Sequence, residues 1–125
     1  MKNLIIDAAA EKIFFKIIIE NKSYTTDYSN CRENFDKFVT LLISFLGKNQ
    51  VKINEIDNIF INQGPGKFSS IRSSIAIAKA LKLTNNINIY GFNSGDIVNK
   101  NYDYIIDLFN KGMLSKNLIK QQYTN

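Results

Sequence analysis

Histidine and tryptophan are absent from this sequence of 125 residues, and cysteine and proline each occur once. A chain without histidine lacks the commonest general base and the commonest metal ligand, which excludes histidine-dependent catalytic triads and argues against a zinc site. The single cysteine, Cys31, cannot form a disulfide within the chain. With no histidine to activate it, we expect its thiol to be buried or to lie in a capping region rather than to act as a nucleophile.

A run of apolar residues long enough to span a membrane is also missing. The apolar run near the start of the sequence ends at Asp7, too early for the hydrophobic region of a signal peptide. We therefore expect a cytoplasmic protein that makes no membrane contact.

Arginine is scarce, so lysine supplies nearly all of the positive charge behind the net charge of +5. Asparagine and isoleucine are abundant alongside lysine, a combination typical of genes rich in adenine and thymine. The basic charge is therefore weak evidence for nucleic-acid binding.

Apolar residues are plentiful enough for one compact domain with a buried core, since hydrophobic residues make up 45% of the chain. Their spacing predicts strands over 3–8, 13–20, 23–28, 57–61 and 87–91. The run from Ile13 to Ile19 is apolar except at Lys16, as in a strand covered on both faces, so we expect it to be central in the sheet.

Helical spacing of apolar residues predicts helices over 35–47 and 68–83. Asn30 and Glu33 form an imperfect capping box before the first helix, and Gly47 ends it. The order is a three-stranded β-meander followed by helix, strand, helix and strand. The sequence thus predicts an α/β fold with a mixed sheet.

A further amphipathic helix is expected near the C-terminus. One helical face carries Tyr102, Ile105, Ile106, Phe109 and Met113. Leu118 and Ile119 continue this face if the helix bends or splits at Gly112.

A glycine-rich elbow, residues 62–72, connects the fourth predicted strand to the second helix. Its G-P-G-K segment looks like the end of a phosphate-binding P-loop, but two fixed positions of that motif are wrong. Ile61 stands where the first glycine belongs, and Phe68 stands where the magnesium-binding hydroxyl belongs. The spacing therefore argues against a P-loop nucleoside triphosphatase.

Without the lysine, the elbow resembles the G-P-G-S-F-T-G-[LIV]-R motif of the TsaB (YeaZ) family, the accessory proteins that help to make threonylcarbamoyladenosine on tRNA. The segment 4–9, L-I-I-D-A-A, is similar to the family's opening I-D-T-[AS] strand. Glu33 and Phe35 lie where the family has H-S-E-x-L at a helix start. The resemblance covers residues 1 to about 95.

The sequence departs from the family's pattern at several positions. Cys31 replaces a histidine, Lys67 and Ser70 replace serine and glycine, and Ala8 replaces a threonine. The family's second domain has no counterpart, whether lost, carried by another chain or cut away, and we expect a natural short form. The resemblance implies half of an actin-like (ASKHA, RNase H-like) fold in residues 1–95, with 96–125 as a C-terminal helical extension of the same domain.

The turn after the first strand does not suit nucleotide chemistry. Actin-like ATPases have D-x-G-x-T there, whereas this chain has D-A-A-A-E-K at 7–12, with neither the glycine nor the hydroxyl. Glu11 adds a negative charge near the place of the phosphates. We therefore expect no nucleotide cofactor, no bound metal and no catalytic residue, and we expect Asp7 to close its strand by accepting a backbone hydrogen bond.

The second helix carries a row of small residues that would allow another helix to approach closely. A helical wheel gives it three sides. They are a core-facing side of Ser70, Ser74, Ile77, Ala78 and Leu81, the small row of Ser69, Ser73, Ala76 and Ala80, and a remaining side of Arg72, Ile75, Lys79 and Lys82. The narrow polar stripe leaves more apolar surface than one sheet face can cover, which favours a partner, although packing of the small row on the first helix of the same chain is nearly as good an explanation.

The resemblance implies that the two helices pair with the catalytic paralogue TsaD, or with a second copy through the second helix. The elbow then positions the helix, with Gly64 or Gly66 at a positive φ. The predicted partner-binding residues are Gly64, Pro65, Gly66, Phe68, Ser69, Arg72, Ser73, Ile75, Ala76, Lys79 and Ala80. A TsaE-like ATPase is a further expected partner, and contact with tRNA is expected to be indirect.

Two other functions remain open at this point. One is an ATPase-like half-domain that binds nucleotide across a self-paired dimer, using Lys67 and the backbone N–H groups of the elbow. The other is a basic tRNA-binding module, for which aromatic residues interleaved with the basic residues are missing.

Overall fold

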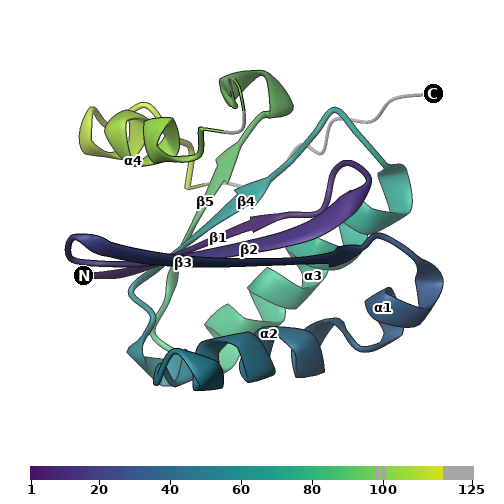
Figure 1. Ribbon diagram of the computed structural model, residues 1–125. Coiled ribbons are helices and arrows are strands. Elements are labelled where there is room, and N and C mark those ends of the chain that lie inside the picture. The colour runs from purple at the N-terminus through teal and green to yellow at the C-terminus, as the bar shows by residue number, and fades with distance from the viewer. Residues whose placement is uncertain (98, 100, 117–125) are drawn as a thin grey trace.

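The computed structural model describes residues 1–97, 99 and 101–116. At its centre is a five-stranded sheet in the order β3-β2-β1-β4-β5 (Figure 1). The strands are β1 (Lys2–Asp7), β2 (Lys12–Ile19), β3 (Lys22–Ser29), β4 (Asn58–Asn62) and β5 (Asn88–Phe92). Each bound lies within one residue of its prediction, so all five predicted strands are confirmed.

The sheet is mixed, because the meander β1-β2-β3 is antiparallel whereas β4 and β5 run parallel to β1. β1 is the middle strand, and β2 is an inner strand between β3 and β1, so the prediction that 13–20 does not form an edge is confirmed. As predicted, its continuous apolar run is covered on both faces. Phe15 faces the larger core, whereas Phe14 stacks on Tyr102 on the opposite face, with ring centroids 4.4 Å apart.

Four α-helices and two short 3₁₀-helices accompany the strands among the described residues. They are α1 (Arg32–Asp36), α2 (Phe38–Lys48), η1 (Ile53–Glu55), α3 (Phe68–Thr84), η2 (Ser94–Asp96) and α4 (Asp103–Asn110). In Figure 1, α1, α2 and α3 cover one face of the sheet and α4 lies over the other. The predicted α/β class and the order of its elements are confirmed.

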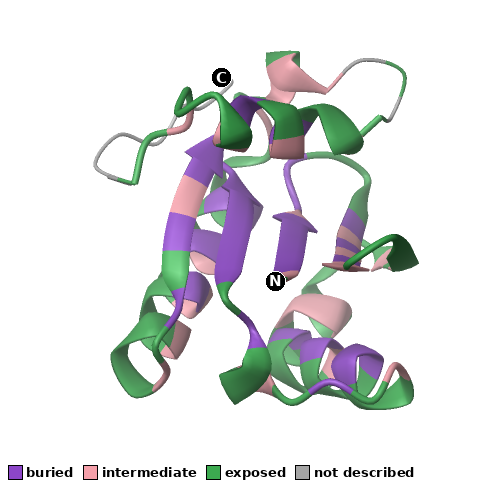
Figure 2. Ribbon diagram, turned by 90° about the vertical axis from the view of Figure 1, so that its left-hand side faces the viewer, coloured by how far each residue is buried: buried purple, intermediate pink, exposed green. Residues whose placement is uncertain are grey.

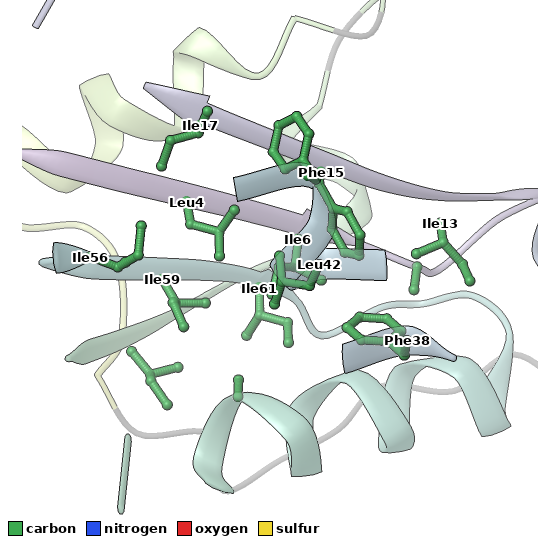
Figure 3. Packing of buried hydrophobic residues seen from close by; sticks show 14 of the residues in the cluster. Leu4, Ile6, Ile13, Phe15, Ile17, Phe38, Leu42, Ile56, Ile59 and Ile61 are labelled. Carbon is green, nitrogen blue, oxygen red and sulfur yellow. The ribbon is translucent and has the colours of Figure 1, made fainter. Parts of the chain in front are cut away.

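The larger core lies between the sheet and the layer of α1, α2 and α3. Leu4, Ile6 and Phe15 point from the sheet toward Phe38 and Leu42 of α2, and each of these side chains is at most 1% exposed (Figure 3). The rings of Phe15 and Phe38 meet edge to face at 5.3 Å. Figure 2 shows the same division, with buried inner strands and helices that expose their outer sides.

A smaller core on the other face joins α4 to the sheet. Ile5 and Phe60 from the central strands pack with Ile105 of α4 and Phe92 of β5, all at most 1% exposed. Phe109 of α4 meets Phe60 edge to face at 5.2 Å. Both sheet faces are therefore covered, which explains why β4 is buried at every residue.

The beginning of the first helix differs from the prediction. Residue 37 separates α1 from α2, and the N-cap of α1 is Cys31, with no side-chain cap. The Asn30–Glu33 capping box is therefore wrong. Asn30 instead donates its side-chain amide to carbonyls of the β1–β2 turn.

The end of α4 also differs. Gly112 adopts φ 70° and donates its N–H to Phe109 O, while Met113 donates to Leu108 O. This pair of bonds is the Schellman motif, which stops a helix at a residue in the left-handed region. Met113 is 66% exposed and does not share the buried face, so its prediction is wrong, and Leu118 and Ile119 lie outside the described residues.

No helix in the described ranges is long and apolar enough to cross a membrane.

The packing of α4 on the sheet predicts that alanine substitutions at two neighbouring residues of this helix differ in their effect on stability. Ile105→Ala removes a side chain that is fully buried and should lower the free energy of unfolding by about 2–5 kcal/mol. Tyr104→Ala is the matched control, because Tyr104 is 42% exposed on the same helix and its loss should have little effect. Urea denaturation followed by circular dichroism measures both changes. Equal losses for the two variants would contradict the assigned packing of α4.

Candidate functional site

The elbow connects the end of β4 to the start of α3 through a turn that Asn62 holds. The Asn62 side-chain oxygen accepts the Gly64 N–H at 2.7 Å, and its amide donates to Asp7 Oδ1 at 3.0 Å. Gly64 has φ 105°, in the region that favours glycine, and is joined to Pro65 by a cis peptide bond. The prediction that one elbow glycine has a positive φ is thus confirmed for Gly64.

Gly66 is required for a different reason, namely close contact with the β1–β2 turn. A Cβ atom at residue 66 would lie 2.3 Å from the carbonyl oxygen of Ala9. The next residue, Lys67, donates its N–H to that same oxygen at 2.8 Å. The two glycines therefore serve separate purposes, one for backbone conformation and the other for space.

The N–H groups of the elbow are used largely within the chain. Gln63 donates to Phe92 O at 2.8 Å, Gly64 to the Asn62 side chain and Lys67 to Ala9 O. These donors are consequently not free to surround a phosphate. The Lys67 ammonium lies 3.6 Å from a carboxylate oxygen of Glu11, and because both side chains are exposed this pair adds little stability.

Asp7 closes β1 as its sequence position predicts. Its carboxylate accepts the Ala9 N–H at 3.1 Å, the Asn62 amide at 3.0 Å and the Tyr102 hydroxyl at 2.7 Å. Burial raises the pKa of Tyr102 above its ordinary value, and the negative charge and hydrogen bond of Asp7 raise it further. The sequence gives no local sign of this pair, because the two residues are 95 positions apart.

Asn30 connects three parts of the site. Its amide donates to Ala8 O at 3.0 Å and to Ala10 O at 2.7 Å, and its oxygen accepts the Ser70 hydroxyl at 3.0 Å. The end of β3, the β1–β2 turn and the first turn of α3 are thereby held together. Sequence reasoning assigned Asn30 only to helix capping and missed this role.

The outer side of α3 carries most of the predicted partner-binding residues. Phe68 is 44% exposed, and the Arg72 guanidinium lies 5.3 Å from the centre of its ring, a cation–π contact. Ser73 is half-buried. The remaining exposed members on α3 are Ser69, Ala76, Lys79 and Ala80.

The structure corrects the prediction that Ile75 contacts a partner, because Ile75 is only 1% exposed and belongs to the larger core. The buried stripe of α3 consists of Ser70, Ile71, Ser74, Ile75 and Ala78. Ile77 and Leu81, which the helical wheel placed toward the core, pack only at its margin. The core-facing side is therefore rotated relative to the prediction, toward the residues that meet β4 and β5.

Two hollows lie on either side of the small row of α3. The first, about 370 Å³, is lined by Phe68, Ser69, Arg72, Ser73 and Ala76. The second, about 340 Å³, lies toward α1 and is lined by Asn30, Cys31, Arg32, Phe35, Ser69, Ser70 and Ser73. Ser69 and Ser73 line both hollows. Ser69, Ala76 and Ala80 are exposed, so these three members of the small row are not buried against the first helix.

The described residues contain no cluster of three or more His, Cys, Asp or Glu side chains that could hold a metal ion. Cys31 is exposed at the start of α1, as expected for a thiol in a capping region.

Comparison with known families gives the chain its relatives. The family model described as "TsaD: tRNA N6-adenosine threonylcarbamoyltransferase" matches residues 12–103. The tRNA threonylcarbamoyladenosine biosynthesis protein TsaB of Buchnera aphidicola subsp. Baizongia pistaciae is 31% identical over 85 residues, which cover 67% of this chain and 38% of that protein. The chain belongs to the TsaB (YeaZ) family.

A second TsaB protein, from Buchnera aphidicola subsp. Schizaphis graminum, is 29% identical over 94 residues, or 74% of this chain and 42% of the relative. The matched part thus spans less than half the length of either TsaB protein.

Solved structures agree with this family assignment at the level of the fold. YeaZ from Pseudomonas aeruginosa superposes with a TM-score of 0.71 at 18% identity, covering 77% of this chain and 45% of that structure. RuvC from T. thermophilus, in complex with a Holliday junction substrate, has a TM-score of 0.54 at 6% identity over 78% of this chain and 67% of its own. The predicted actin-like, RNase H-like half is confirmed by the YeaZ likeness.

The elbow contact predicts opposite effects of alanine at two glycines. Gly66→Ala forces a Cβ into the Ala9 carbonyl and should destabilise the fold by about 1–3 kcal/mol, as overpacking does. Gly47→Ala is the control, because a Cβ there meets nothing within 4 Å, and alanine in a helix should stabilise by up to about 1 kcal/mol. Thermal unfolding of both variants measures the changes. A neutral Gly66→Ala would rule out the close contact.

The Tyr102–Asp7 hydrogen bond predicts a pH dependence. Above a pH of about 10 the unfolded chain releases the Tyr102 proton, whereas the folded chain still holds it. The stabilisation is therefore complete below that pH and is lost as the pH rises above it. Tyr102→Phe should therefore lower the free energy of unfolding at neutral pH by about 1–3 kcal/mol, and its difference from the native chain should shrink at alkaline pH. Urea denaturation of both proteins at neutral and at alkaline pH measures this difference in the free energy of unfolding. A gap that stays constant would refute the pKa assignment, and Tyr104→Phe, at an exposed position of α4, is the control.

Proposed function

We propose that this chain is a non-catalytic subunit in the biosynthesis of threonylcarbamoyladenosine on tRNA, and that it binds a TsaD-type catalytic partner through the outer side of α3. The names of its curated relatives support the process. The family model named for the transferase supports a catalytic partner with a related fold, against which such a subunit can pack.

One observation carries the assignment of the surface, namely the open row of small residues with a hollow on each side. Ser69 and Ala76 are exposed, and Ser73 lines both hollows. A row of small side chains lets a second helix approach closely, and the hollows receive its larger side chains. Phe68 and Arg72 at the first turn add an aromatic ring and a cation, two groups enriched where proteins bind each other.

The position of this row is fixed before any partner arrives. The start of α3 is held by the Lys67 N–H bond to Ala9 and by the Ser70 hydroxyl bond to Asn30. A surface that is ordered in advance loses less conformational entropy on binding. This geometry supports docking better than catalysis.

An ATPase-like function has less support. The N–H groups of Gln63, Gly64 and Lys67 are bonded within the chain, and the turn that faces the elbow has no glycine or hydroxyl for a phosphate. A TsaE-like ATPase is included in the proposal as a further partner. Pairing of two copies through α3 would compete for the same surface as TsaD.

Ala76→Arg tests the proposed surface. Arginine favours helices, and Ala76 is exposed, so the domain should stay folded while the large side chain blocks the approaching helix. The affinity for the TsaD-like protein of the same organism should fall by about tenfold or more, equivalent to at least about 1.4 kcal/mol. Copurification and calorimetric titration measure the loss.

The matched control is Tyr104→Arg, which places the same side chain on α4, on the opposite face of the sheet. Binding that survives Ala76→Arg, or the absence of a complex with the folded native chain at micromolar concentrations, would refute the proposal. Calorimetric titration of the native chain with ATP and magnesium tests the nucleotide alternative, for which a binding isotherm is required.

A further inference from the structure

On the α4 side of the sheet, β3 extends beyond the part that α4 covers. The smaller core takes its buried side chains from β1, β4, β5 and α4, and no residue of β3 belongs to it. The residues of β3 that share this sheet face with Phe14 are all exposed, namely Ser23, Thr25, Asp27 and Ser29. A shelf of sheet surface over β2 and β3 therefore remains beside α4.

A cavity of about 420 Å³ lies on this shelf. Residues of the β1–β2 turn, β2 and β3 line it together with Tyr102, and we call it the β2–β3 pocket. Its volume is within the range of pockets that bind small molecules. The pocket is separate from the elbow and from the outer side of α3, because α3 lies on the other face of the sheet (Figure 1).

Part of the lining of the β2–β3 pocket is aromatic. Phe14 and Tyr102 both line it, and their rings stack with centroids 4.4 Å apart and planes inclined by 16°. The Tyr102 ring is held in place by the hydrogen bond of its hydroxyl to Asp7 Oδ2 at 2.7 Å. The pocket thus has an ordered apolar surface on which a ring or a large apolar side chain can pack.

Three of the five charged side chains that line the pocket already have partners. The Lys16 ammonium lies 3.1 Å from Asp103 Oδ1, and the Lys16 side chain is only 14% exposed. The Asp7 carboxylate accepts three hydrogen bonds. A carboxylate oxygen of Glu11 lies 3.6 Å from the Lys67 ammonium.

The other two charged residues of the lining are Lys12 and Asp27. Within the described part of the chain, neither side chain forms an ion pair or a hydrogen bond. Lys12 lies opposite Ser29 in the β2–β3 register, so Lys12 and Asp27 are diagonal neighbours on one sheet face. The Cα atoms of such a pair are about 7–8 Å apart, which lets the two side chains hold different groups of one small molecule.

We propose that the β2–β3 pocket binds a free α-amino acid with an aromatic or large apolar side chain. The Lys12 ammonium pairs with the carboxylate of the ligand, and the Asp27 carboxylate pairs with its ammonium group. The side chain of the ligand packs on the stacked rings of Phe14 and Tyr102.

The charges of the lining favour a zwitterion over other small molecules. One unpaired cation and one unpaired anion each gain an opposite charge from an amino acid, whereas a simple cation or anion leaves one of them without a partner. A phosphate would lie near the carboxylates of Asp7, Glu11 and Asp27, which repel it. The inference uses no residue of α3, so it does not depend on the proposed function.

Titration of the isotope-labelled full chain with phenylalanine, followed by NMR, tests the pocket. Phenylalanine should shift the signals of the Thr25 and Asp27 N–H groups saturably, with a dissociation constant in the millimolar range or tighter. Alanine carries the same two charges without the ring and should bind about tenfold more weakly, because it makes no contact with the aromatic rings.

Two substitutions distinguish the two charge contacts. Lys12→Gln should weaken phenylalanine binding by about threefold or more, as expected for an exposed ion pair, and should not affect phenethylamine, which has no carboxylate. Asp27→Asn should weaken phenylalanine binding by a similar factor and should not affect phenylpropionate, which has no ammonium group. A merely structural effect of either substitution would change the binding of both compounds.

Lys22→Gln is the matched control, because Lys22 is an exposed lysine at the other end of β3 and does not line the pocket. Circular dichroism melting verifies that every variant is folded. The absence of saturable shifts with the native chain, or affinity for phenylalanine that survives both Lys12→Gln and Asp27→Asn, would overturn the proposal. So would equal affinity for alanine, or an equal loss with Lys22→Gln. Ala76→Arg should leave phenylalanine binding unchanged, so this inference and the proposed function can fail separately.

Discussion

The contact between the elbow and the β1–β2 turn fixes the rest of the site. The carbonyls of Ala8, Ala9 and Ala10 each accept a hydrogen bond from another part of the chain, two from the Asn30 side chain and one from the Lys67 N–H. The absence of a side chain at Gly66 lets the elbow come this close. Because α3 begins directly after the elbow, its position relative to β1 and β3 follows from this contact.

The strands and their order could be predicted from the sequence, because apolar spacing along a strand is a local property. The spacing of the elbow could also exclude a P-loop. The partners of Asn30 and Tyr102 could not be predicted, because Ser70 is 40 residues from Asn30 and Asp7 is 95 residues from Tyr102. Nothing in the sequence near either residue indicates which distant group it meets.

The orientation of α3 could be predicted only in part. Isoleucine, leucine and alanine occur around most of this helix, so a helical wheel has little contrast between polar and apolar sides. Packing on β4 and β5 decides the choice and buries Ile71 and Ile75. The outer side is consequently more polar than the sequence indicated. An excess of apolar surface is thus a weaker reason for a partner than the shape of the small row and its two hollows.

The cover on the second face of the sheet limits where partners can bind. α4 closes the face that carries Ile5 and Phe60, and the segment after it returns to the outer side of β5. With that face covered over β1, β4 and β5 and that edge partly covered, the outer side of α3 and the edge of β3 remain open in the described part of the chain. A helix that packed on α3 would place its side chains in the hollows, whereas a strand added to β3 would form backbone hydrogen bonds. Because these two modes of recognition use different chemical groups on separate elements, a partner on one surface would leave the groups of the other unused.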